Sequence, residues 1–219
     1  MKLFADTGNL RELEALASLG ILDGVTTNPS LMAKEGGDPR QILKQICRLV
    51  QGPVSAEVVA TDAAGMVREG RELAAIDEHI VVKVPFTKDG VKACKTLASE
   101  GKRVNVTLIF SPTQAWLAAK VGAAYVSPFV GRLDDVGTTG MNLVREIVDI
   151  FDNFEYSTEV LVASVRHPIH IVEAARMGAD VVTCPPAVIE QSFKHPLTDI
   201  GLAKFLQDWE KAQAASAKA

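Results

Sequence analysis

Residues 79–85 read HIVVKVP, a run of β-branched side chains interrupted by a single lysine. Short apolar runs of this kind, bounded here by Pro85, are typical of a strand that is buried on both faces. Side chains alternate between the two faces of a strand, so Lys83 shares its face with Val81 and Pro85. The stretch therefore predicts an interior strand with a lysine near its carboxyl end.

Similar apolar runs recur along the chain and alternate with longer amphipathic segments. The runs predict strands at Lys2–Ala5, Gly24–Thr26, Val54–Val58, Ile80–Val84, Arg103–Thr107, Ala124–Val126, Glu159–Ala163 and Asp180–Val182. The amphipathic segments predict helices at Asn9–Leu19, Pro39–Val50, Asp62–Ile76, Lys88–Ser99, Pro112–Val121, Thr139–Phe151, Pro168–Met177 and Pro185–Gln191. Strict alternation of strands and helices implies parallel strands joined by helical crossovers.

The number of repeats predicts the fold class, which is α/β. Eight strand–helix units in a chain of 219 residues favour a (β/α)8 TIM barrel over an open, doubly wound sheet, which is the alternative. We expect residues 1–219 to form a single barrel domain with an extra C-terminal helix at 199–211. This helix could pack on its own barrel or dock on a neighbouring subunit, and residues 212–219 are expected to fray.

Composition excludes several classes of function. The net charge is −4 and no run of Lys and Arg occurs, so nucleic acid is not expected as a partner. No segment approaches the roughly 20 apolar residues that span a bilayer, and the N-terminus lacks a signal-peptide pattern. Cys47, Cys94 and Cys184 have no CxxC spacing, which favours reduced thiols and a cytoplasmic location. His167 and His170 lack the companions of a ligand cluster, so we expect no metal.

Polar side chains gather at the carboxyl ends of the predicted strands, where barrel enzymes place their active sites. Strand alternation directs most of them into the barrel. They are Asp6, Asn28, Glu57, Lys83, Asn105, Thr107, Ser127 and Ser164. An unpaired buried charge is costly, so a purely structural core would not collect them. The structural alternative is an ion pair of Lys83 with Glu57 or Asp6.

A buried lysine suggests covalent chemistry. Burial disfavours the ammonium ion, and the free amine of Lys83 can then attack a carbonyl group. The resulting iminium is an electron sink that permits cleavage of an adjacent carbon–carbon bond. Asp6 could exchange protons with the substrate hydroxyl at that bond, while Glu57 and Thr107 could hold the water that leaves and re-enters.

Other side chains are candidates for binding the substrate. Asn28 and Asn105 could bind hydroxyl groups. Arg132 and Arg166 follow two late strands, and the second is preceded closely by Ser164. Late barrel loops often bind phosphate, and the guanidinium fork suits that anion, so we expect a phosphate site there rather than two surface salt bridges.

Six short motifs together resemble the transaldolase family. They are ADT at 5–7, GVTTNPS at 24–30, VVKVP at 81–85, NVTLIFS at 105–111, SPFVGR at 127–132 and ASVR at 163–166. The resemblance runs from residue 2 to about residue 211, and the chain length is similar to that of the short subfamily, which also contains fructose-6-phosphate aldolase.

The resemblance implies a role for each candidate residue. Lys83 would form the Schiff base, Asp6 would act as the acid–base group, and Glu57 with Thr107 would handle water. The implied dihydroxyacetone-binding residues are Asn28, Asn105 and Ser127, and the implied phosphate-binding residues are Arg132, Ser164 and Arg166. The resemblance also implies sugar phosphate substrates, no cofactor, and pentameric rings stacked into decamers, with the C-terminal helix reaching a neighbouring subunit.

Phe129 is also expected to contact the substrate, and Glu57 and Phe129 together bear on the choice within the family. Aldolase members tend to carry Gln and Tyr at these positions, so the sequence favours transfer of a dihydroxyacetone unit over its release. Fructose-6-phosphate aldolase activity is the alternative interpretation. A metal-dependent barrel enzyme and a barrel kept only for binding or assembly are further alternatives.

Overall fold

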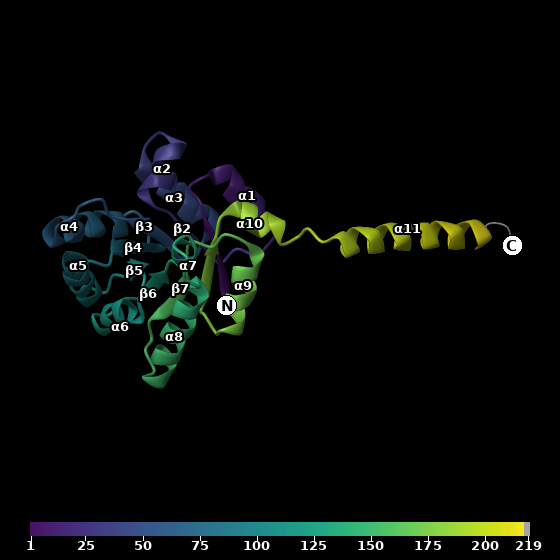
Figure 1. Ribbon diagram of the computed structural model, residues 1–219. Coiled ribbons are helices and arrows are strands. Elements are labelled where there is room, and N and C mark those ends of the chain that lie inside the picture. The colour runs from purple at the N-terminus through teal and green to yellow at the C-terminus, as the bar shows by residue number, and fades with distance from the viewer. Residues whose placement is uncertain (217–219) are drawn as a thin grey trace.

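The computed structural model describes residues 1–216 and forms a closed barrel of parallel strands in chain order (Figure 1). The strands are β1 (Lys2–Asp6), β2 (Gly24–Thr26), β3 (Val54–Glu57), β4 (Ile80–Pro85), β5 (Val104–Ile109), β6 (Tyr125–Pro128), β7 (Glu159–Val162) and β8 (Val181–Cys184). β8 pairs with β1, which closes the sheet. The predicted barrel is therefore confirmed, and an open sheet is excluded.

Each predicted helix is present between its strands, with ends shifted by a few residues. These helices are α1 (Leu10–Ser18), α3 (Pro39–Val50), α4 (Ala63–Ala74), α5 (Lys88–Ser99), α6 (Pro112–Lys120), α8 (Gly140–Asn153), α9 (Pro168–Arg176) and α10 (Pro186–Gln191). Proline begins α3, α6 and α9, where its missing N–H leaves no bond unmade. Pro185 precedes its helix instead, because α10 begins one residue later.

Two short helices, α2 (Pro29–Glu35) and α7 (Val130–Asp134), were not predicted. α2 buries none of its side chains, and α7 is only five residues long. A hydrophobic period of 3.6 residues cannot be recognised over one turn or on a helix without an apolar face. Both helices follow strand ends, so both border the site described below.

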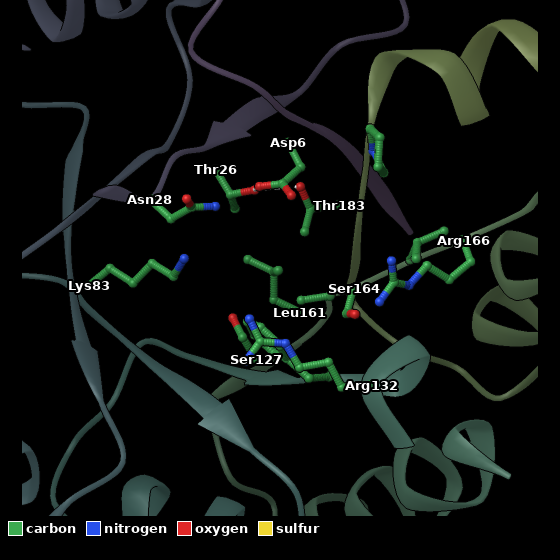
Figure 2. A pocket seen from close by; sticks show the side chains of 14 residues that line it. Asp6, Thr26, Asn28, Lys83, Ser127, Arg132, Leu161, Ser164, Arg166 and Thr183 are labelled. Carbon is green, nitrogen blue, oxygen red and sulfur yellow. Dashed lines mark hydrogen bonds between the residues drawn. The ribbon is translucent and has the colours of Figure 1, made fainter. Parts of the chain in front are cut away.

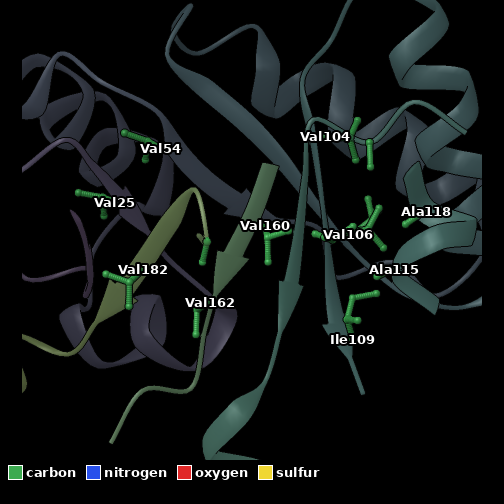
Figure 3. Packing of buried hydrophobic residues seen from close by; sticks show 14 of the residues in the cluster. Val25, Val54, Val104, Val106, Ile109, Ala115, Ala118, Val160, Val162 and Val182 are labelled. Carbon is green, nitrogen blue, oxygen red and sulfur yellow. The ribbon is translucent and has the colours of Figure 1, made fainter. Parts of the chain in front are cut away.

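The core has two layers separated by the strands. Figure 3 shows the outer layer, in which Val25, Val54, Val106 and Val182 face the surrounding helices. The inner layer fills the barrel and consists of Phe4, Val81, Tyr125, Leu161, Ala163 and Val181. Most of these lie two residues before a polar residue on the same face of their strand. The apolar inner layer therefore forms the floor beneath a polar layer at the carboxyl ends of the strands.

Gly24 leaves room for the inner side chain of Phe4. A Cβ atom at this position would lie 2.6 Å from the Phe4 ring and 2.7 Å from the Pro53 carbonyl oxygen. The ring is fully buried and meets Tyr125 edge-on, with centroids 6.4 Å apart. A side chain at Gly24 would displace Phe4, and with it the floor of the barrel.

The C-terminal helix α11 (Pro196–Ser216) extends away from the barrel (Figure 1). It buries none of its side chains, so packing on its own barrel is not observed. It also begins before residue 199 and continues beyond 211, so the predicted fraying is wrong for residues 212–216. Residues 217–219 lie outside the described part. Among residues 1–216, no helix combines the length and hydropathy that crossing a bilayer requires.

Candidate active site

Strand register brings the central polar residues into one row. Glu57 on β3 pairs with Lys83 on β4, which pairs with Asn105 on β5. Paired residues on parallel strands direct their side chains to the same face. Three polar side chains predicted from strand alternation therefore lie side by side inside the barrel, near its carboxyl-terminal mouth.

A cavity of about 220 Å³ opens at this mouth (Figure 2). Its lining includes eight of the predicted site residues, which are Asp6, Asn28, Lys83, Ser127, Phe129, Arg132, Ser164 and Arg166. Glu57, Asn105 and Thr107 are not in its lining. Glu57 instead borders a neighbouring, more apolar cavity of about 350 Å³ beside α2.

Lys83 is buried, with 5% of its surface exposed, and its amine is held by two oxygen atoms. Nζ lies 3.0 Å from Oε2 of Glu57 and donates to the carbonyl oxygen of Thr27 at 3.1 Å. The ion pair considered as a structural alternative is thus present. This ion pair explains why Lys83 and Glu57 are buried together. It does not explain why Asp6 and two arginines line the same cavity as Lys83.

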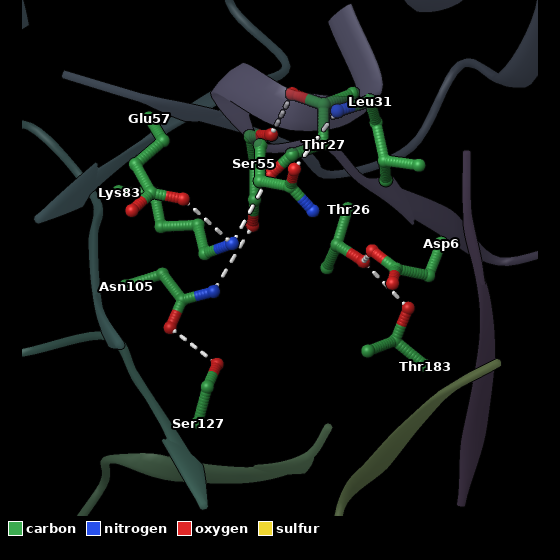
Figure 4. Close-up of polar contacts among 11 residues, drawn as sticks. Asp6, Thr26, Thr27, Leu31, Ser55, Glu57, Lys83, Asn105, Ser127 and Thr183 are labelled. Carbon is green, nitrogen blue, oxygen red and sulfur yellow. Dashed lines mark hydrogen bonds and ion pairs between the residues drawn. The ribbon is translucent and has the colours of Figure 1, made fainter. Parts of the chain in front are cut away.

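Asp6 is held by a hydroxyl group of the neighbouring strand β2, which in turn contacts a hydroxyl group of β8 (Figure 4). Thr26 Oγ1 donates to Asp6 Oδ1 at 2.7 Å, and the same hydroxyl lies 2.7 Å from Thr183 Oγ1. Burial raises the pKa of Asp6, and the Thr26 hydrogen bond and the charge of Lys83 partly oppose this increase. A carboxyl group with a raised pKa can gain and lose a proton closer to neutral pH, as a general acid–base group must.

Asn105 and Ser127 begin a buried hydrogen-bonded chain on the β5 side of Lys83, whereas Glu57 lies on its β3 side. Ser127 Oγ donates to Asn105 Oδ1 at 2.7 Å, and Asn105 Nδ2 donates to Ser55 Oγ at 3.2 Å (Figure 4). All three side chains are almost fully buried. Satisfied polar groups of this kind fix side-chain orientation, so the Ser127 hydroxyl has a defined position on the cavity wall.

Asn28 has a structural role in addition to its place in the cavity. Its Oδ1 accepts the backbone N–H of Leu31 at 2.9 Å and caps α2. The cap uses the carbonyl oxygen, so the amide NH2 group is the part that remains to face a ligand. The sequence suggested the ligand role alone, because α2 was not predicted.

Thr107 is nearly fully buried, and its hydroxyl has no hydrogen-bond partner among the described residues. It pairs in register with Pro85, two residues beyond Lys83, so it faces the barrel on the same side as the lysine. The strand becomes irregular immediately after it, where Leu108 adopts a φ of 60°. A buried hydroxyl that lacks a partner in the protein is costly, which sets Thr107 apart from the bonded side chains around it.

The two arginines lie at the mouth of the cavity, away from Lys83 (Figure 2). Arg132 belongs to α7, and its guanidinium carbon lies 5.0 Å from the centre of the Phe129 ring. Arg166 follows β7 and forms an ion pair of 2.8 Å with Asp135. Ser164 between β7 and Arg166 has a φ of 60°, which turns the chain sharply at the rim. The predicted convergence of these side chains on one cavity is observed.

Several supporting residues were missed by sequence reasoning. Thr26, Thr183 and Ser55 are polar residues on the inward faces of β2, β8 and β3, where they hold Asp6 and Asn105 in place. Strand alternation applied to β2 and β8 would have found the two threonines. The Thr27 carbonyl that accepts from Lys83 could not be found in this way, because it is a backbone atom. Within residues 1–216, no three His, Cys, Asp or Glu side chains are grouped to hold a metal ion.

The protein is a parallel α/β barrel, and one cavity at its mouth is lined by a buried lysine, a carboxyl group and two arginines. These features are typical of barrel enzymes that act on small anionic substrates. Comparison with known proteins identifies the family. The profile of "Transaldolase/Fructose-6-phosphate aldolase" matches residues 3–216, and the chain belongs to this enzyme family.

Individual relatives agree with this assignment. A protein of Nitrosopumilus maritimus named "Probable transaldolase" is 59% identical over 98% of this chain and 97% of its own length. A protein of the same name from Aquifex aeolicus is 59% identical over 96% and 97%. Among solved structures, the carboxyl transferase domain of Rhizobium etli pyruvate carboxylase is 11% identical with a TM-score of 0.61, covering 84% of this chain and 40% of the other. At that identity the structure supports the fold alone.

Proposed function

We propose that this enzyme is a transaldolase that works through a Schiff base on Lys83. It would transfer a dihydroxyacetone unit from sedoheptulose 7-phosphate or fructose 6-phosphate to glyceraldehyde 3-phosphate or erythrose 4-phosphate, as in the pentose phosphate pathway. The observation that carries the proposal is one cavity lined by the Lys83 amine, the Asp6 carboxyl group and two arginines.

The reaction begins when the free amine of Lys83 attacks the ketose carbonyl and the resulting carbinolamine loses water. Asp6 then removes the proton from the hydroxyl at C4, the C3–C4 bond breaks, and an aldose phosphate leaves. The electron pair of the broken bond passes into the iminium and gives an enamine. The enamine attacks the acceptor aldehyde, Asp6 returns its proton to the new alkoxide, and water releases the product from Lys83.

Water must enter and leave at the carbon bonded to Lys83, and two side chains could hold it there. Glu57 lies 3.0 Å from the lysine amine, and Thr107 supplies a buried hydroxyl without a partner among the described residues. Ser127, Asn105 and the Asn28 amide would bind the dihydroxyacetone hydroxyls. Arg132, Ser164 and Arg166 would bind the phosphate at the mouth, because arginine forks match phosphate oxygens.

Covalent trapping tests the mechanism directly. Borohydride added with fructose 6-phosphate should reduce the iminium and leave a stable adduct on the peptide containing Lys83, detected by mass spectrometry. Lys83→Ala should give no adduct and no transfer. Lys88→Ala is a matched control, because Lys88 begins α5 and takes no part in the cavity. An adduct that forms on another lysine would overturn the proposal.

Fructose-6-phosphate aldolase activity is the second candidate function. Free dihydroxyacetone release, measured with and without erythrose 4-phosphate, separates the two, and release without acceptor as fast as transfer would favour the aldolase. Phe129 packs edge-on against Phe110 at 5.9 Å and offers no hydroxyl to the cavity. We therefore expect Phe129→Tyr to raise the ratio of release to transfer.

The proposal includes a homo-oligomer, a pentamer or decamer, assembled through α11. Apolar side chains along this helix are exposed, including Phe205 at 72% and Trp209 at 63%. Monomeric proteins rarely leave such a surface uncovered. Light scattering should give a mass several times that of one chain, and deleting residues 196–219 should lower it to a single chain. The three cysteines are free thiols, which supports the cytoplasmic location included in the proposal.

A further inference from the structure

His170 is a buried histidine with no place in the proposed reaction. It lies in the first turn of α9, with 4% of its surface exposed, and it does not line the cavity. Its Nδ1 accepts the backbone N–H of Arg166 at 3.3 Å, and its Nε2 lies 3.1 Å from Oδ2 of Asp134. The ring thus contacts the two segments that carry the arginines of the cavity mouth.

The two contacts define the protonation state of the ring. Nδ1 accepts a hydrogen bond, so the proton of the neutral ring is on Nε2, which donates to Asp134. Burial lowers the pKa of His170, and the adjacent His167 ring lowers it further, although Asp134 and Glu173 oppose this. Neutral His170 can make both hydrogen bonds at once, whereas the protonated ring would lose the acceptor for Arg166.

Asp134 connects His170 to the helix that carries Arg132. It is the last residue of α7, and its Oδ1 also accepts the N–H of Gly140 at the start of α8. The opposite end of α7 is fixed to the same loop as Arg166, because the Gly131 N–H donates to the Ser164 carbonyl at 3.0 Å. A Cβ on Gly131 would lie 2.2 Å from that oxygen, so α7 is packed tightly against the loop.

We infer that His170 is a positioning residue for the substrate phosphate, which fixes the backbone of Arg166 and, through Asp134, the helix that carries Arg132. The inference rests on the proposed function to the extent that these arginines bind phosphate. Two guanidinium groups from separate segments bind one anion well only if the segments keep a fixed spacing. His170 joins them from behind without contacting the ligand.

Two conservative substitutions separate the contacts of the ring. His170→Asn keeps an oxygen near the position of Nδ1, where it can accept the Arg166 N–H. His170→Gln keeps an N–H near the position of Nε2, where it can donate to Asp134, but it loses the Nδ1 acceptor. The comparison therefore tests the backbone hydrogen bond of Arg166 with two side chains of similar polarity.

The measured quantity is phosphate discrimination, defined as the ratio of kcat/KM for glyceraldehyde 3-phosphate to kcat/KM for glyceraldehyde as acceptor. We expect His170→Gln to reduce this ratio by about fivefold to tenfold, the change that one buried hydrogen bond produces. His170→Asn, which keeps the Arg166 hydrogen bond but loses the contact with Asp134, should reduce the ratio less, by about twofold to fivefold, because Asp134 is still held by the Gly140 N–H. Borohydride trapping on Lys83 with free dihydroxyacetone as the added ketose involves no phosphate, so the yield of adduct should be the same in all three proteins.

The outcomes distinguish failure of the inference from failure of the proposed function. Unchanged discrimination in His170→Gln would overturn the inference while trapping on Lys83 still supported the enzyme mechanism. Equal loss of trapping and discrimination in both variants would also overturn it, because it would indicate general destabilisation. If the wild type itself formed no adduct on Lys83, the proposed function would fail, and the inference with it.

Discussion

The two ends of the cavity are built in different ways. At the inner end, Lys83 projects from β4, between Glu57 and Asn105 on the adjacent strands, and these side chains are bonded to buried partners. At the mouth, Arg132 belongs to the short helix α7, and Arg166 lies on a loop, where it pairs with an exposed aspartate. The inner end is a rigid part of the sheet, whereas the mouth depends on contacts between short segments.

This difference corresponds to two kinds of task. Bond formation and proton transfer need reacting atoms held within fractions of an ångström, and side chains on strands provide that precision. Binding a phosphate needs charge and a fork of donors, and side chains of loops and short helices can supply both. Mutations at the inner end should therefore reduce the rate of the chemical steps, and mutations at the mouth should alter substrate recognition.

The largest effect is expected from Asp6→Asn, at the inner end. Loss of a general acid–base group should lower kcat by on the order of 10²- to 10⁴-fold. The amide oxygen of the substituted side chain can still accept from Thr26, so the surrounding hydrogen bonds remain. Steady-state transfer between fructose 6-phosphate and erythrose 4-phosphate measures this loss. Retention of more than a tenth of wild-type kcat would show that another group moves the proton.

Stability provides an independent check on Asp6. Burial raises the pKa of Asp6 in the folded state. At a pH between the unfolded and the folded pKa, the folded protein therefore binds more protons than the unfolded chain. The stabilisation is therefore complete below the unfolded pKa and is lost as the pH rises through the folded pKa. At pH 7 the buried carboxyl group lowers stability, because it ionises less readily in the folded protein than in the unfolded chain, and Asp6→Asn should unfold at the same urea concentration as the wild type or a higher one. The stability difference between Asp6→Asn and the wild type should shrink as the pH approaches 4. An Asp6→Asn variant that is less stable than the wild type at pH 7 would contradict this prediction.

A smaller and more selective effect is expected from Arg166→Ala at the mouth. Loss of hydrogen bonds between a guanidinium group and phosphate should reduce phosphate discrimination by about tenfold to a hundredfold. Activity with unphosphorylated glyceraldehyde should change little. Arg145→Ala is the matched control, because Arg145 lies on α8 beside a different surface cavity. An equal loss with both acceptors would show that Arg166 supports the chemical step instead.

The same difference explains which parts the sequence could predict. Strand alternation was sufficient to direct Lys83, Glu57 and Asn105 into the barrel, because a buried strand has a period of two residues and closure fixes its register. The outline of the barrel followed from the alternation of strands and helices. These features depend on local pattern and on a fold with few alternatives.

Other features depend on tertiary contacts that no local pattern records. α2 and α7 are too short for helical periodicity, so the cap made by Asn28 could not be foreseen. The arginines were predicted to share a rim because both follow late strands, but their spacing is set by contacts such as the hydrogen bond from the Gly131 N–H to the Ser164 carbonyl. The far end of α11 was misjudged because no packing against the barrel limits its length.

The smallest expected effect comes from Asp135→Asn, which probes how Arg166 is held at the mouth before a ligand binds. Asp135 pairs with Arg166 at 2.8 Å, and both side chains are more than half exposed. The carboxylate must yield its place when phosphate binds, so removing its charge should increase phosphate discrimination. Exposed ion pairs are worth about 0–1 kcal/mol, which limits the gain to roughly fivefold, and screening by about 0.5 M salt should remove most of it. Asp149→Asn on α8 changes the net charge equally but lies at another cavity, and it should have no effect. A decrease in discrimination for Asp135→Asn would instead mean that the carboxylate orients Arg166 toward the ligand, and the mouth would then be preorganised like the inner end.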